Sequence, residues 1–255
     1  MIVRKSHDEI EAMARAGRVL ADVLAALADA IEPGATTGEL DAIAEERIRA
    51  EAAVPTFKGY RGFPGSICAS PNAMVVHGIP GAYRLEEGDL ISIDVGVTLG
   101  GFVADSAYTF PVGEIDPEAH RLLDVCQGAL AAGIAAARPE NHVGDISAAV
   151  QRTTEEAGFA IVKALVGHGV GRSMHEEPQV PNHGEPGRGP RLAPGMTLAI
   201  EPMITAGSEQ IVVADDEWSI STVDGSLSAH FEHTVAVTED GPRILTEAAV
   251  GSLLP

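Results

Sequence analysis

Two aspartates in a predicted hairpin are the first residues whose spacing could support chemistry. Residues 90–109 form two runs of β-favouring residues on either side of a Gly-Gly pair. With a two-residue loop at Leu99 and Gly100, Asp94 is expected directly across from Asp105. Opposed Cβ atoms in a hairpin lie about 4.5–5.5 Å apart, and like charges there destabilise the sheet. Such a pair therefore indicates a shared proton or a cation, unless a bulge or longer loop sends one aspartate to solvent.

Three further residues could complete a cation site. Glu201 lies in the apolar segment TLAIEPMI, where an unpartnered carboxylate is costly to bury. His168 lies between two glycines, which allow its backbone to approach a ligand closely. Glu232 lies in SAHFEHTVAVTEDG, and strand alternation places it on the same face as His230. Together with the two aspartates, this set suits divalent Mn, Fe, Co or Zn and has enough oxygen atoms to bridge two ions.

Each of these residues also has a purely structural interpretation. A single carboxylate at a strand end is usually solvated, and a single histidine is as readily a satisfied core residue as a ligand. We interpret His230 and His233 as structural, and residues 215–217 as an exposed acidic loop. Four further histidines are expected at the surface: His7, His120, His142 and His183. The coincidence of acids and histidine on strands of matching phase favours the metal site.

Composition excludes several classes of protein. Of the 255 residues, 45% are hydrophobic, which excludes intrinsic disorder. Only Cys68 and Cys126 are present, which excludes a disulfide framework and a zinc finger. A net charge of −20 argues against a direct nucleic-acid role. The sequence shows neither an apolar run of about 18 residues nor a signal segment, so we expect no membrane association and a cytoplasmic location.

Four helices and an internal repeat are predicted. Capping boxes start helices near Ser6 and Thr36, which extend to about residues 31 and 53, and further helical patterns cover residues 116–135 and 139–158. A shift of 106 residues aligns four positions of the two halves: Pro33, Gly38, Leu40 and Ala42 with Pro139, Gly144, Ile146 and Ala148. A shift of 107 aligns residues 88–94 with 195–201 and matches Asp94 with Glu201. The sequence therefore predicts one α+β domain over 1–255, duplicated as roughly 7–110 and 115–245, with a pseudo-twofold axis through a central cleft.

The segments NAMVVHGIP, IDVGVTLGGFVADSA, GHGVGRSMHEEP, TLAIEP and SAHFEHTVAVTEDG resemble those of the type I methionine aminopeptidases. These motifs occur in the family's order between residues 60 and 245, so the resemblance covers nearly the whole chain. It implies the duplicated pita-bread fold, in which helices cover an antiparallel sheet. The short spacing between His168 and Glu201 lacks the long insertion of the type II group.

The resemblance also implies a role for each site residue. Asp94 would bind one metal, Asp105 and Glu232 would bridge the pair, and His168 and Glu201 would bind the second. Glu201 would also be the general base that activates a bridging water. Two histidines, His77 and His175, would contact substrate, and the methionine pocket would consist of five residues: Tyr60, Phe63, Cys68, Met174 and Trp218. A pocket of aromatic and sulfur-bearing side chains suits a thioether, and Cys68 would line it without acting as a nucleophile.

The expected activity is removal of the initiator methionine from nascent proteins and peptides, with a small second residue preferred. We expect a monomer. Family members of bacteria dock on the ribosome through basic loops, but residues 208–226 carry acids and neither lysine nor arginine, which puts such docking in doubt. The alternatives are a proline-specific peptidase or creatinase-like hydrolase of the same fold, and a catalytically inactive binding module.

Overall fold

The computed structural model describes residues 1–247 and confirms the four expected helices. They are α1 (His7–Ala30), α2 (Thr37–Ala50), α3 (Pro117–Ala136) and α4 (Val143–Glu156). Both predicted capping boxes form, because the Ser6 and Thr36 hydroxyls accept from the backbone of Glu9 and Glu39, whose carboxylates accept in return. No helix within residues 1–247 is long and apolar enough to cross a membrane.

The described strands pair antiparallel in four small sheets. The first has the order β1-β4-β2, with β5 also paired to β4, and the second has the order β15-β14-β9-β7-β8. Two three-stranded sheets, β13-β10-β6 and β11-β12-β3, complete the arrangement. The bounds are β1 Val54–Pro55, β2 Ile67–Pro71, β3 Met74–Val76, β4 Leu90–Leu99, β5 Phe102–Pro111, β6 Ala160–Ile161, β7 Val166–Gly169, β8 Glu176–Pro181, β9 Thr197–Ile200, β10 Met203–Thr205, β11 Ile211–Val213, β12 Ile220–Thr222, β13 Ser228–His230, β14 His233–Thr238 and β15 Gly241–Ile244.

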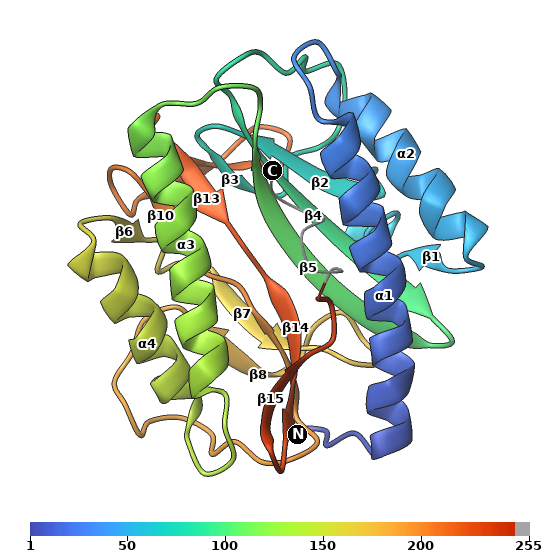
Figure 1. Ribbon diagram of the computed structural model, residues 1–255, viewed down its shortest axis with the longest axis vertical. Coiled ribbons are helices and arrows are strands. Elements are labelled where there is room, and N and C mark those ends of the chain that lie inside the picture. Colours follow the sequence, from blue (N-terminus) through green and yellow to red (C-terminus); the bar gives the residue numbers. More distant parts are fainter. Residues whose placement is uncertain (248–255) are drawn as a thin grey trace.

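The helices lie in two pairs over the strands (Figure 1). One pair is α1 and α2, and α1 packs on β4 and β5 around a core that includes Leu20, Leu24 and Ile93. The other pair is α3 and α4, which cover β13 and β8 around a core that includes Ile146 and Phe231. Burial of one apolar face of each helix against the strands stabilises both halves.

The register of the β4–β5 hairpin differs from the prediction. The loop is Gly100-Gly101, with φ values of 60° and 80°, so Asp105 pairs with Gly96 and Asp94 pairs with Ala107. A turn with positive φ at both loop positions favours glycine and disfavours the Leu99 that the predicted loop required. The expected direct opposition of the aspartates was therefore wrong, and so was the bulge. Because Asp94 and Gly96 are two residues apart, the aspartates still share a face as diagonal neighbours.

The two halves repeat a local contact at the predicted spacing. Isolated bridges join Thr36 to Arg84 and His142 to Arg191, and the members of one bridge are shifted by 106 and 107 residues from those of the other. We propose that the chain is a single domain with an internal repeat, and these paired bridges support that proposal.

Side-chain hydroxyls join the halves along one line, which we call the seam and which runs between β5 and the segment of β13 and β14. The Thr109 hydroxyl donates to the carbonyl oxygen of His230 and accepts from its N–H, at 2.8 and 2.9 Å. The Thr234 hydroxyl makes the same two-way contact with the backbone of Asp105, at 2.8 and 2.9 Å. One backbone bond, from Glu232 N to Ala107 O at 2.9 Å, lies between them. The seam places metal-binding residue types from both halves side by side.

Candidate active site

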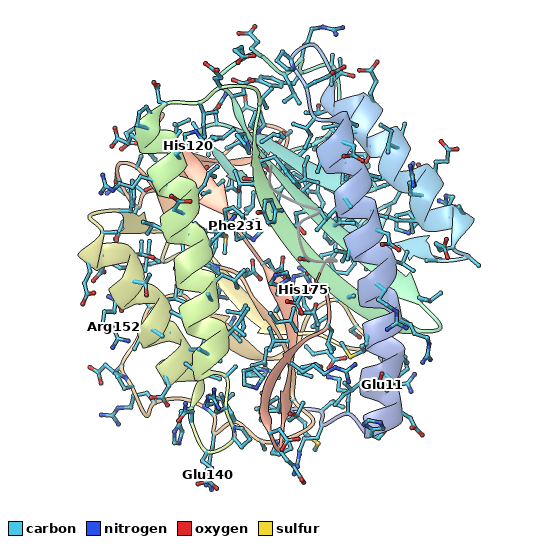
Figure 2. The ribbon with its side chains drawn as sticks, viewed as in Figure 1. Glu11, His120, Glu140, Arg152, His175 and Phe231 are labelled. Atoms are coloured by element: carbon cyan, nitrogen blue, oxygen red, sulfur yellow. The ribbon has the colours of Figure 1, made fainter. Side chains whose placement is uncertain are left out.

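A cavity of about 210 Å³ brings together every site residue that the sequence predicted. The predicted metal ligands in its wall are Asp94 on β4, Asp105 on β5, His168 on β7, Glu201 just after β9, and Glu232 between β13 and β14. The predicted substrate-contacting residues in its wall are Tyr60, Phe63, Cys68, His77, Met174, His175 and Trp218. In Figure 2, His175 is seen between the ribbons of α1 and α3.

His168 is oriented for ligation. Its Nδ1 lies 2.9 Å from the carbonyl oxygen of Gly169, and a carbonyl can only accept, so Nδ1 carries the proton. The other ring nitrogen, Nε2, then presents a lone pair 3.6 Å from Asp105 Oδ2 and 3.5 Å from Glu201 Oε1. Burial lowers the pKa of His168, while the Glu201 carboxylate opposes that effect. A neutral imidazole fixed in this tautomer is the form that binds a metal ion.

The carboxylates around His168 are buried with too few hydrogen-bond donors. Within residues 1–247, Asp94 Oδ1, Asp105 Oδ1 and Glu232 Oε1 have no hydrogen-bond partner. Burial raises the pKa values of Asp94 and Glu201 to about 7, and it raises those of Asp105 and Glu232 well above their usual range. Buried oxygen atoms without donors require protons or cations nearby. The donor set therefore fits divalent metal ions.

Two groups of potential ligands share Glu232. The first is Asp105, His168 and Glu232, and the second is Glu201, His230 and Glu232; in each, one ligand atom per residue lies within 4.8 Å of the others. His230, which we interpreted as structural, lies in the cavity wall and belongs to the second of these groups. Strand alternation had already placed it on the face of Glu232, and that signal was available in the sequence. His233 is not among the residues of the cavity wall, and its Nδ1 lies 2.9 Å from the Thr246 hydroxyl.

The two predicted substrate histidines lie on the same cavity. His77 follows β3 with a φ of 60°, a conformation that is uncommon for a residue with a side chain. Burial lowers its pKa to about 4, so the ring is neutral. His175 has its Nδ1 2.9 Å from the Tyr60 hydroxyl, and its ring centroid lies 4.3 Å from that of His168. Burial also lowers the pKa of His175, so both rings favour the neutral form and can form hydrogen bonds.

Part of the cavity wall is apolar. Phe63 and Trp218 meet edge to face, with centroids 5.1 Å apart. The Asp216 carboxylate accepts from the N–H groups of Trp218 and Ser219 at 2.9 and 2.8 Å, and so fixes the loop that carries the tryptophan. Burial raises the pKa of the Cys68 thiol well above its usual value, so Cys68 lines the wall as a thiol.

A buried ion pair holds the loop that carries Met174 and His175. The carboxylate of Glu176 accepts from the backbone N–H groups of Arg172 and Ser173, at 2.8 and 3.2 Å. Lys5, from the N-terminal segment, reaches the same carboxylate with its Nζ at 2.6 Å. The side chain of Lys5 is only 3% exposed, so water screens this pair weakly.

Sequence reasoning did not identify part of the lining. The additional wall residues are Phe57, Arg61, Val76, Leu165, Val166 and Met203. Phe57 and Arg61 lie in the glycine- and aromatic-rich segment before β2, so a signal existed for them. Leu165 and Val166 precede His168 without any local pattern that distinguishes them from core residues.

The chain matches a protein family and curated relatives over nearly its whole length. The model of metallopeptidase family M24 matches residues 11–239. The methionine aminopeptidase of Clostridium perfringens (strain 13 / Type A) is 50% identical over 96% of this chain and 99% of the relative. Methionine aminopeptidase 1 of Bacillus subtilis (strain 168) is 49% identical with the same coverage.

Solved structures give the same result for the fold. The crystal structure of methionine aminopeptidase from Rickettsia prowazekii has a TM-score of 0.96 at 38% identity, covering 97% of this chain and 100% of that one. Prolidase from Pyrococcus furiosus has a TM-score of 0.77 at 22% identity, and the match covers 97% of this chain but 66% of that one. The second similarity is one of fold alone.

Proposed function

Because the chain belongs to metallopeptidase family M24 and is a hydrolase, we propose that it removes the N-terminal methionine from nascent proteins and peptides. The resemblance noted in the motifs is confirmed by these relatives, as is the mixed helix and antiparallel-sheet class of the pita-bread fold. The observation that carries the proposal is the cavity, which joins a carboxylate–imidazole cluster to an apolar pocket of thioether-compatible residues.

We assign the metal ligands as the sequence resemblance implies. Asp94 would hold one ion, Asp105 and Glu232 would be shared, and His168 and Glu201 would hold the other, which agrees with the shared position of Glu232 in both groups. When bound, two divalent ions lower the pKa of a shared water and polarise the scissile carbonyl. Several ions (Co, Mn, Fe or Zn) suit such ligands.

Glu201 is the proposed general base. A base works best when its pKa lies near the operating pH, and burial raises the pKa of Glu201 to about 7. Its carboxylate lies at the cavity wall, 3.5 Å from Nε2 of His168, and the positive charge of a bound ion would draw its pKa down again. The Glu201 carboxylate would take the proton from the attacking water and pass it to the leaving amine.

The two substrate histidines would orient the peptide. His77 is a neutral donor beside Trp218, with ring centroids 6.5 Å apart, so it would bond the scissile amide next to the methionine pocket. Because the Tyr60 hydroxyl occupies Nδ1 of His175, the other nitrogen is left for the substrate. A larger second side chain would collide with the rim beside His175, which accounts for a preference for small second residues.

The cellular setting is also proposed. We propose a cytoplasmic monomer that acts on emerging chains without a direct nucleic-acid role. The 215–217 acids lie exposed at the loop before Trp218, so this rim of the cavity is negatively charged. That charge disfavours docking of the rim on ribosomal RNA.

Release of methionine from a Met-Ala-Ser peptide tests the function. Chelated protein should be inactive and should recover activity after re-addition of a single divalent metal. Glu201→Ala should abolish turnover with the fold intact by circular dichroism, while the exposed-site variant Glu217→Ala should retain it. Activity on Xaa-Pro dipeptides with none on Met-Ala-Ser would overturn the proposal in favour of a proline-specific peptidase. Inactivity on both, with no metal bound, would favour a binding module.

A further inference from the structure

We infer that His230 is a sixth protein ligand of the metal centre and binds the ion on the Glu201 side. The inference rests on the proposed metal-dependent function but goes beyond the five ligands that the family resemblance implies. It starts from a buried nitrogen atom: Nε2 of His230 has no hydrogen-bond partner within residues 1–247, and the residue is 2% exposed. A buried imidazole without any partner is costly unless it binds something.

The backbone holds this ring in one place. His230 ends β13 and pairs with Met203 of β10. On its other side, the Thr109 hydroxyl bonds both the N–H and the carbonyl oxygen of His230 across the seam. A residue fixed by two strands has little freedom to turn its side chain away from the cavity. The ring is therefore pre-organised beside the carboxylates.

The distances suit a shared ion better than a hydrogen bond. Nε2 of His230 lies 3.6 Å from Glu201 Oε2 and 3.9 Å from Glu232 Oε2. Both distances exceed those of ordinary N–H···O hydrogen bonds, which are about 2.7–3.2 Å. Two ligand atoms that each lie about 2.0–2.2 Å from one ion are separated by at most about 4.4 Å. Both separations fall inside that limit.

The assignment also changes the chemical character of the centre. With five ligands, His168 is the only imidazole among four carboxylates. His230 would add a second imidazole, on the ion that His168 and Glu201 would hold, and Glu232 is close enough to both imidazoles to share an ion with each. Imidazole suits Zn and Fe, carboxylates suit Mn, and Co²⁺ binds nitrogen and oxygen ligands more tightly than Mn²⁺. His230 would therefore bias the Glu201 side away from manganese.

Metal binding to the full chain tests this directly. Chelator-treated parent, His230→Gln and His233→Gln proteins would be titrated with Co²⁺, Zn²⁺ and Mn²⁺ by calorimetry, and the visible absorption of Co²⁺ would be recorded. Glutamine keeps a neutral polar side chain beside Glu201, but it is a poor replacement for an imidazole ligand. His233 is the matched control, because it is a neighbouring half-buried histidine whose ring contacts the Thr246 hydroxyl instead.

We expect His230→Gln to weaken Co²⁺ and Zn²⁺ binding at one site at least tenfold, roughly the minimum seen for changes outside the ligand shell itself. Mn²⁺ binding should fall less, and the Co²⁺ absorption bands should shift, while His233→Gln matches the parent. Unchanged affinity and bands in His230→Gln would overturn the assignment. If that variant does not fold, X-ray absorption of the Co²⁺-loaded parent decides: two imidazoles per two ions support the assignment, and one overturns it.

The result can be separated from the proposed function. If the parent protein releases methionine and His230→Gln keeps full Co²⁺ affinity, the proposed function stands and His230 is not a ligand. If the parent protein binds metal through His230 but cleaves neither Met-Ala-Ser nor an Xaa-Pro dipeptide, His230 is a ligand and the proposed function is wrong.

Discussion

Replacing Glu201 by glutamine should make the metal-free protein more stable while abolishing hydrolysis. In the folded chain, burial raises the pKa of this carboxyl from its usual value near 4.5 to about 7. Below about pH 4.5 the Glu201 carboxyl is protonated in both the folded and unfolded states, so its ionisation does not lower the stability of the fold. As pH rises from 4.5 through 7, the unfolded state ionises first, and the folded state loses stability. Glutamine, which is neutral and nearly isosteric, removes that loss.

The size of the gain follows from the two pKa values. At about 1.36 kcal/mol per pH unit, a change from 4.5 to about 7 corresponds to about 3 kcal/mol. For a domain of this size, about 3 kcal/mol corresponds to roughly 6–12 °C in melting temperature. The gain should be absent at pH 4.5, should grow with pH, and should level off above pH 7. Buried histidines such as His77 also make stability depend on pH, but they are present in both proteins and cancel in the difference.

Thermal and urea unfolding of chelated parent and Glu201→Gln proteins at pH 4.5, 6 and 7.5 would measure this difference. The exposed-loop variant Glu217→Gln serves as the control and should track the parent at every pH. A Glu201→Gln protein that melts at or below the parent temperature at pH 7.5 would refute the argument. Glu201 would then be solvated in the metal-free state, and its suitability as a base would need another cause.

Three further outcomes are expected. Lys5→Met should lower the free energy of unfolding, measured in urea, by about 2–3 kcal/mol, because Glu176 is then partly buried without its cation. The double variant Lys5→Met, Glu176→Gln should lose less stability than the sum of the two single changes. Trp218→Ala should raise KM for Met-Ala-Ser about tenfold with a smaller change in kcat, since it removes the wall that Phe63 contacts; a fall in kcat alone would contradict a binding role. Asp105→Asn should weaken metal binding by calorimetry without lowering the melting temperature of chelated protein, and a much earlier melt would contradict the repulsion between clustered carboxylates.

The sequence predicted on which face of its strand each aspartate lies, but not which residue pairs with it across the hairpin. The β4–β5 register was wrong by two residues because the loop was placed one position early. A shift of two preserves the face of every side chain, so Asp94 and Asp105 still share the cavity. A shift of one would have turned one of them away. The capping boxes at Ser6 and Thr36 predicted helix starts correctly because they depend on local hydrogen bonds alone.

Other parts of the site depend on long-range packing that local patterns do not encode. Strand alternation placed His230 on the same face as Glu232. Its position in the cavity wall is evident only from its approach to Glu201, which the local sequence does not predict. Leu165 reaches the cavity through the course of the loop before β7, and Lys5 meets Glu176 across 171 residues of chain. Neither contact leaves a periodic or spacing signal.

Because the proposed ligands lie on both sides of the seam between β5 and the segment of β13 and β14, a bound ion would act as a reversible cross-link between the two halves of the chain. Asp94 and Asp105 lie on one side of the seam, and His168, Glu201 and Glu232 lie on the other. Any ion held from both sides binds only the closed arrangement and therefore stabilises it in proportion to its concentration and affinity. Amide hydrogens along the seam, such as those of Asp105 and His230, should then exchange with solvent more slowly as metal is added, and amides buried under α1 should change far less.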